Sequence, residues 1–107
     1  MPKIVALAHG ITSLKLALAG IHVEDTADAR AVEARLSELL EERDCHVVIL
    51  MERFRSGFSE WFTEHLRKHK GLPLVVNCPA FEQEESNVDA YLSAVLKPAV
   101  GYEIRLE

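Results

Sequence analysis

The chain lacks the residue groups that mark several common classes of protein. Its 107 residues contain no long block of Lys and Arg and carry a formal net charge of −5, so a basic face for nucleic acid or anionic lipid is missing. Its two cysteines, Cys45 and Cys78, fit neither a disulfide scaffold nor a zinc or redox motif. No apolar run is long enough to span a bilayer. These absences favour a cytoplasmic protein whose partners are other proteins.

Glycine-rich loops that bind phosphate are also missing. The five glycines are scattered, and Gly10 stands alone where dinucleotide-binding folds need several. His65 and His69 lie four residues apart on one predicted helix, but no third ligand accompanies them, and two histidines seldom form a closed metal site. We therefore expect no cofactor, no metal ion and no catalytic residues.

The first 79 residues alternate short apolar runs with amphipathic segments. Uncharged runs rich in β-branched residues predict strands, and apolar residues that recur every three to four positions predict helices. Strands are expected at about 3–8, 21–23, 46–51 and 74–77, and helices at about 12–20, 25–43 and 58–71. Thr12 or Ser13 is expected to cap the first helix, and the Asp25–Asp28 segment the second. The alternation predicts an α/β fold, a four-stranded mostly parallel sheet flanked by helices, Rossmann-like or receiver-like.

The remaining residues are expected to form a separate C-terminal segment beside the α/β domain of residues 1–79. Residues 80–87 are acidic with little apolar surface to bury, and are interpreted as a hinge loop. Residues 88–107 are predicted to form a mobile helix and a tail, and Pro98 is expected to kink or end that helix. Five apolar side chains form one stripe on it: Val88, Tyr91, Leu92, Val95 and Leu96. The stripe fits a partner's groove, and it also fits an ordinary covering helix folded back on the sheet.

His9 offers a different hypothesis. Ligands of parallel sheets usually bind beyond the carboxyl ends of the strands, and His9 and Gly10 follow the first predicted strand. A histidine there could accept a phosphoryl group in a small phosphotransfer component. A turn histidine beside a conformationally free glycine explains the same pair without chemistry. A third hypothesis is a stand-alone receiver-like protein-binding module, although the acidic pair with which receiver domains hold a metal is absent after the first strand.

Several short patches resemble the F subunit of the rotary V-type and archaeal A-type ATPases. Leu16–Ile21 is similar to the family's segment after the first strand, and Val47–Arg53 is similar to its third unit. The ending, Val100–Leu106, matches most closely, and the patches agree in order and spacing over nearly the whole chain. The chain departs from the family pattern at Ala17, where an arginine is usual, and around His9, where Gly-Asp is common.

This resemblance implies a non-catalytic subunit of the central rotor stalk, which helps to couple ATP hydrolysis or synthesis to proton or sodium transport. It implies that the C-terminal stripe of five residues binds the coiled coil of another stalk protein, the D subunit, and that docking or release of the helix modulates hydrolysis. On this hypothesis Leu92 and Val95 face the partner rather than the sheet. The resemblance also implies a peripheral location on the cytoplasmic side of a membrane, held there by the rest of the complex without insertion.

Overall fold

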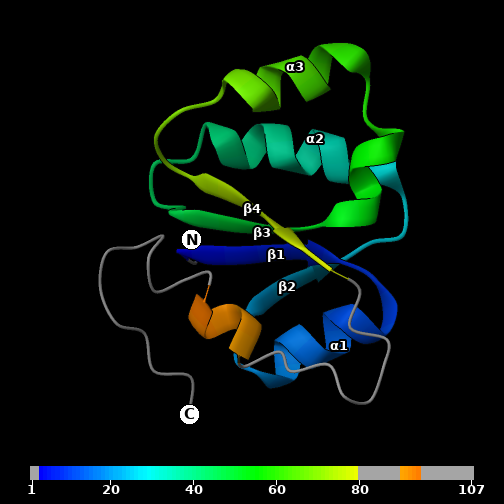
Figure 1. Cartoon of the computed structure of the whole chain (residues 1–107), viewed down its shortest axis with the longest axis vertical. Coiled ribbons are helices and arrows are strands. Elements are labelled where there is room, and N and C mark those ends of the chain that lie inside the picture. The colour runs from blue at the N-terminus through cyan, green and yellow to red at the C-terminus, as the bar shows by residue number, and fades with distance from the viewer. Residues whose placement is uncertain (1–2, 80–89, 95–107) are drawn as a thin grey trace.

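A computed structural model describes residues 3–79 and 90–94 of the chain (Figure 1). Its elements are β1 (Ile4–Ala8), α1 (Gly10–Leu18), β2 (His22–Asp25), α2 (Ala29–Leu40), β3 (Val47–Met51), the 3₁₀ helix η1 (Glu52–Gly57), α3 (Glu60–Lys68) and β4 (Leu74–Cys78). Residues 90–94 add a helical turn. The expected hinge at 80–87, the ends of the C-terminal helix and tail, and the expected kink at Pro98 lie outside the described residues.

The four strands form one sheet in the order β2-β1-β3-β4, and every pair is parallel. Figure 1 shows α1 on one face of this sheet and α2 and α3 on the other, with the helical turn 90–94 on the same face as α1. The α/β fold predicted from the sequence is confirmed. The chain first moves outward from β1 to β2 and then crosses back past β1 to β3, so the strand order reverses between β1 and β3.

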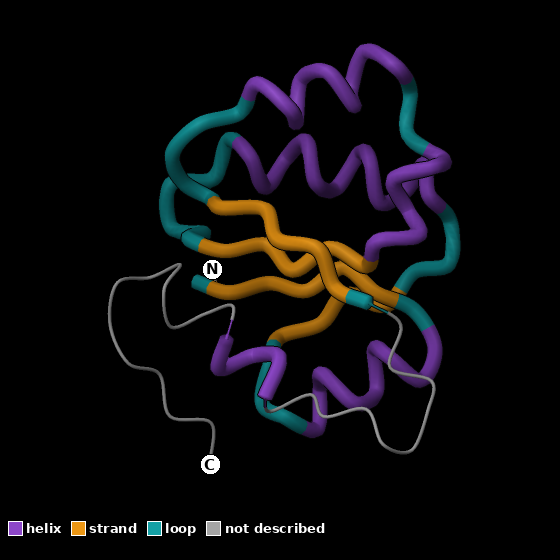
Figure 2. Tube along the Cα trace, viewed as in Figure 1, coloured by secondary structure: helices purple, strands orange, loops and turns teal. Residues whose placement is uncertain are grey.

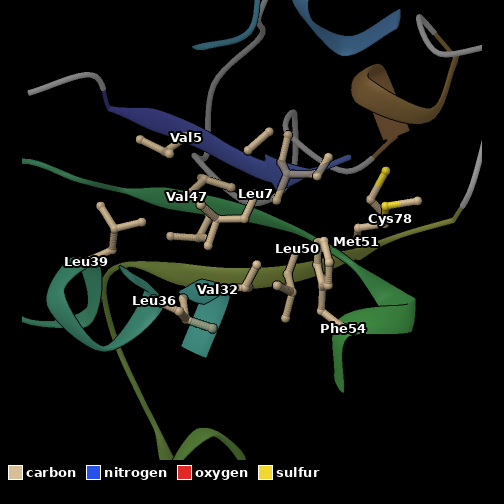
Figure 3. Close-up of a cluster of buried hydrophobic side chains, with 14 of the residues drawn as sticks. Val5, Leu7, Val32, Leu36, Leu39, Val47, Leu50, Met51, Phe54 and Cys78 are labelled. Carbon is tan, nitrogen blue, oxygen red and sulfur yellow. The ribbon is translucent and has the colours of Figure 1, made fainter. Parts of the chain in front are cut away.

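The core lies around the two central strands. All five residues of β3 are buried, as expected for a strand covered on both faces (Figure 2). Helix α2 contributes Val32, Leu36 and Leu39, which recur at helical spacing and are fully buried against the sheet (Figure 3). Phe62 does the same for α3, at 1% exposed. Apolar periodicity therefore located the buried face of α2 correctly, whereas on α3 it also included Trp61, which is 70% exposed.

Helix starts were only partly predictable. Asp28 caps α2 by accepting a 3.0 Å hydrogen bond from the Arg30 backbone N–H, as expected. The expected cap of α1 at Thr12 or Ser13 is wrong, because both side chains are buried and the helix already begins at Gly10. Gly10 has φ +71°, a left-handed conformation that lets the chain turn into the helix directly after β1.

The third predicted helix, expected at about 58–71, is shorter in the structure and is preceded by a 3₁₀ helix that was not predicted. Residues 52–57 form η1, and α3 starts only after Ser59, whose hydroxyl accepts a 3.1 Å hydrogen bond from the Phe62 N–H. Glu33 of α2 accepts from the Ser59 N–H at 2.8 Å, so α2 is tied to the start of α3. At the same place a Cβ added to Gly57 would lie 2.5 Å from the Ala29 Cβ, so only a glycine allows η1 this close to α2. The α2, η1 and α3 layer is thus closely joined.

Candidate functional site

The candidate C-terminal stripe is described at two of its five positions. Leu92 is fully buried and belongs to the hydrophobic core, and Tyr91 packs half-buried against that core. Val88, Val95 and Leu96 lie outside the described residues. Leu92 therefore faces the sheet in this structure, whereas the sequence analysis placed it on the partner's side. This arrangement matches the covering-helix alternative, and the assignment of the stripe to a partner stays a prediction.

The end of β4 holds the helical turn 90–94. The Tyr91 hydroxyl donates a hydrogen bond to the backbone carbonyl of Asn77, and the Asn77 side-chain oxygen accepts one from Arg55 Nε at 2.6 Å. One residue further, Cys78 lies next to Tyr91 and is fully buried (Figure 3). The carboxyl end of the edge strand is therefore the place where the C-terminal segment meets the α/β domain.

Burial controls the protonation of the groups at this contact. It raises the pKa of the Cys78 thiol to about 11. Burial is also the main reason why the pKa of the Tyr91 hydroxyl lies above its usual value of 10.0, with the neighbouring Cys78 adding to the effect. Both groups are neutral at neutral pH, so Tyr91 keeps the proton that it donates to Asn77.

His9 and Asp25 meet beyond the carboxyl ends of β1 and β2. His9 Nδ1 lies 3.0 Å from Asp25 Oδ1, and the two side chains are 42% and 59% exposed. The hydrogen bond to a carboxylate oxygen of Asp25 orients the imidazole ring. The part of the chain that the structure describes brings together no group of three or more His, Cys, Asp or Glu side chains that could hold a metal ion.

The remaining candidate residues are two histidines, His65 and His69, and the two cysteines. His69 Nε2 lies 2.9 Å from the Pro73 carbonyl oxygen, while the His65 ring stacks on Trp61 with centroids 5.2 Å apart, so the two histidines do not converge. Cys45 and Cys78 are buried free thiols. These surroundings agree with the interpretation of the cysteines as small buried hydrophobes.

The sequence analysis missed an exposed apolar stripe on α1, formed by Ile11, Leu14 and Leu18. These side chains are 54%, 58% and 78% exposed, whereas Leu16 of the same helix is fully buried. The signal was present in the spacing, since 11, 14 and 18 are three and four positions apart and lie opposite the buried residues 12, 13 and 16.

Comparison with known families identifies the chain. The sequence model of one family, that of the ATP synthase (F/14-kDa) subunit, matches residues 4–95, which include every element of the sheet domain. The chain belongs to this family. The resemblance to the F subunit of the rotary ATPases is thereby confirmed, and as a subunit of an ATP synthase the chain has protein partners. A comparison with curated proteins gave no match.

Family membership agrees with the observed α/β fold, in which helices cover both faces of a four-stranded parallel sheet. None of the helices in residues 3–79 and 90–94 has the length and apolar character needed to cross a membrane. The family match ends at residue 95, so it includes the described turn 90–94 and stops before the tail.

Proposed function

We propose that this subunit of a rotary ATPase is a non-catalytic part of the central rotor stalk, and that it binds the D subunit through its C-terminal segment and one face of the α/β domain. By docking on the D subunit or on its own sheet, the segment modulates ATP hydrolysis and helps to couple it to ion transport. The observation that supports the proposal is the way the described turn 90–94 meets the α/β domain: Tyr91 bonds to Asn77 in β4, and Leu92 is buried in the core.

The size of this contact decides whether a partner can compete for it. Burying one Leu side chain contributes about 1.5–3 kcal/mol, and one hydrogen bond such as that from Tyr91 to Asn77 contributes about 0.5–1.5 kcal/mol. Ordering the segment consumes part of that gain. A net preference of about 2 kcal/mol is within reach of a partner that buries the same side chains, so binding can shift the population from docked to released.

The contact also defines what release exposes. When Leu92 leaves the core, it becomes available to a groove on the D subunit, together with the other predicted contact residues, which are Val88, Tyr91, Val95 and Leu96. The side chain that covers the sheet in one state would then bind the partner in the other. The covering and the partner-binding interpretations of the stripe are in this way two states of one segment.

The test is binding to the D subunit encoded in the same genome, with the full chain and with a version that ends at Asn87. We expect the full chain to form a one-to-one complex and the truncated chain to bind at least tenfold more weakly. Circular dichroism and a thermal melt of the truncated chain serve as the folding control. A full chain that does not bind this partner contradicts the proposed role, and equal binding by the two chains contradicts the role of the segment.

A Tyr91→Phe variant tests the two-state part of the proposal separately. It removes the hydroxyl that donates to Asn77 but keeps the aromatic ring, so the docked state loses about 0.5–1.5 kcal/mol and the D subunit should bind up to about tenfold more tightly. Weaker binding by this variant would show that the hydroxyl contacts the partner instead of restraining the segment.

A further inference from the structure

The outer surface of α1 carries three of the five large hydrophobic side chains that are exposed in the described residues, and almost no charge. The α1 stripe, defined by Ile11, Leu14 and Leu18, is more than half exposed at each position. Lys15 is the one charged residue of this nine-residue helix, although charged residues make up 27% of the chain. A solvated helix normally carries charges on this side.

The stripe is not required by the fold. The side of α1 that faces the sheet carries Thr12, Ser13 and Leu16, which are buried, and the stripe lies on the opposite side. Leu18 contributes little to the core at 78% exposed. Contiguous apolar surface that does not serve the core is a common mark of an interface.

The spacing of the stripe points to a helix as its occupant. Positions 11, 14 and 18 are separated by three and then four residues, which is the spacing of the a and d positions of a coiled-coil heptad. Such a row presents knobs to a second helix that runs almost parallel or antiparallel to it. A peptide in extended conformation would match a two-residue period instead.

Size argues that the occupant is a longer helix rather than a second copy of α1. The helix has nine residues and is about 14 Å long. Its stripe offers on the order of a few hundred Å² of apolar surface, whereas a stable interface buries about 800 Å² on each partner. Two copies that met through this stripe alone would fall short, while a long helix can continue beyond it.

The surface to which such a helix can continue lies on the same face of the sheet. Figure 1 shows the helical turn 90–94 on the α1 side, where Tyr91 bonds to Asn77 of β4 and Leu92 is buried in the core. A partner that engages the C-terminal segment therefore approaches the face that carries the stripe. The α2 and α3 layer is on the opposite face.

We infer that Ile11, Leu14 and Leu18 form a second contact with the D subunit, in which one long helix of that partner packs along α1 with an apolar seam. This inference rests on the proposed function and specifies which face of the α/β domain takes part. The α1 contact holds the sheet domain on the partner whether the C-terminal segment is docked or released. Affinity is then divided between a permanent contact at α1 and a switchable one at the C-terminal segment.

The test compares full-length variants in binding to the purified D subunit. We expect Leu14→Glu with Leu18→Glu to weaken binding at least tenfold, because two charges would be buried in an apolar seam. Leu14→Gln with Leu18→Gln removes the apolar surface without adding charge, and should also weaken binding. Trp61→Glu is the matched control, since Trp61 is 70% exposed on the opposite face, and it should bind as the unsubstituted chain does.

Each outcome decides between the inference and the function on which it rests. All variants should keep the melting temperature of the unsubstituted chain to within about 3 °C, because the substituted side chains are exposed. If the unsubstituted chain binds the D subunit and both double variants bind equally well, the α1 contact is wrong while the proposed function stands. If the unsubstituted chain does not bind, both fail. If the double variants abolish only self-association, the stripe joins two copies of this chain instead.

Discussion

The helices on the two faces of the sheet show different surfaces to solvent. On the α2 and α3 side, charged residues form an ion pair within each helix: Arg35 with Glu38 at 3.0 Å in α2, and Arg67 with Glu64 at 2.8 Å in α3. The exposed Trp61 on that side has one ring face stacked on His65. On the α1 side the exposed positions are aliphatic. The helices on both sides bury apolar residues against the same sheet, so folding alone explains their inner surfaces. Folding does not explain why their outer surfaces differ, and that difference points to partners.

The largest expected effect on stability comes from comparing one Leu→Ala substitution on a buried helix surface with one on the exposed surface of α1. Leu36→Ala, at a fully buried position of α2, should cost about 2–5 kcal/mol of unfolding free energy. Leu18→Ala, on the exposed side of α1, should change it by less than about 0.5 kcal/mol. Urea unfolding measures both. A cost above about 1 kcal/mol at Leu18 would mean that the stripe serves the fold.

Leu92→Ala should have an intermediate effect. Leu92 is as buried as Leu36, but on the proposed two-state model the segment that carries it leaves the sheet while the strands stay folded. We expect a cost of about 1–3 kcal/mol, with faster hydrogen exchange at residues 90–94 than in β3. A cost equal to that of Leu36→Ala, with uniform exchange, would show that the turn unfolds only with the whole domain.

Alkaline pH should release the same segment. Because the pKa of Cys78 is raised from 9.0 to about 11 in the folded state, the released or unfolded state loses this proton first, and Tyr91 has a raised pKa as well. Docking is therefore at full strength below about pH 9 and weakens as the pH rises through 11. Alkylation of Cys78 should accelerate accordingly. Tyr91→Phe with Cys78→Ala should clearly reduce the loss of stability in this range, while Cys45, whose pKa is also raised by burial, keeps its own contribution. An unchanged profile would contradict the assignment.

The smallest effects concern the two ion pairs at the edge near β2. Glu24→Gln breaks the pair with Arg35, in which both side chains are about 30% exposed and whose hydrogen bond raises the pKa of Arg35. We expect a loss of about 1 kcal/mol. Asp25→Asn breaks the more exposed pair with His9 and should cost less than about 0.5 kcal/mol in a urea titration at pH 7. The reverse order would indicate a structural role for His9.

Sequence reasoning succeeded where local pattern and burial coincide. The β-branched run at Val47–Met51 became the central strand, and the periodic residues of α2 became its buried face, because both signals reflect the packing that stabilises them. The start of α1 was misplaced because a single glycine turn replaced the expected side-chain cap. The buried side of α1 could not be read from the sequence, because apolar residues lie on both sides of this helix and periodicity alone does not say which side faces the sheet.

The candidate site was less predictable for a physical reason. An apolar residue such as Leu92 can be buried against its own sheet or in a partner's groove, because the hydrophobic effect is not directional. The sequence of this chain contains the sheet but not the partner's groove, so it cannot show which of the two buries Leu92. The bond from Tyr91 to a backbone carbonyl leaves no mark in the sequence, since every residue has such a carbonyl. The pair of His9 with Asp25 required the register of β1 and β2, which pattern does not give.

The close approach at Gly57 has a mechanical consequence. Because a Cβ there would lie 2.5 Å from the Ala29 Cβ, the backbone of η1 rests directly against α2 with no side chain between them to deform. The Glu33 bond to Ser59 fastens the same joint. In the proposed rotor stalk, twist applied to the sheet would pass through this layer with little deformation. The more deformable part would be the opposite face, where Tyr91 and Leu92 hold the C-terminal segment.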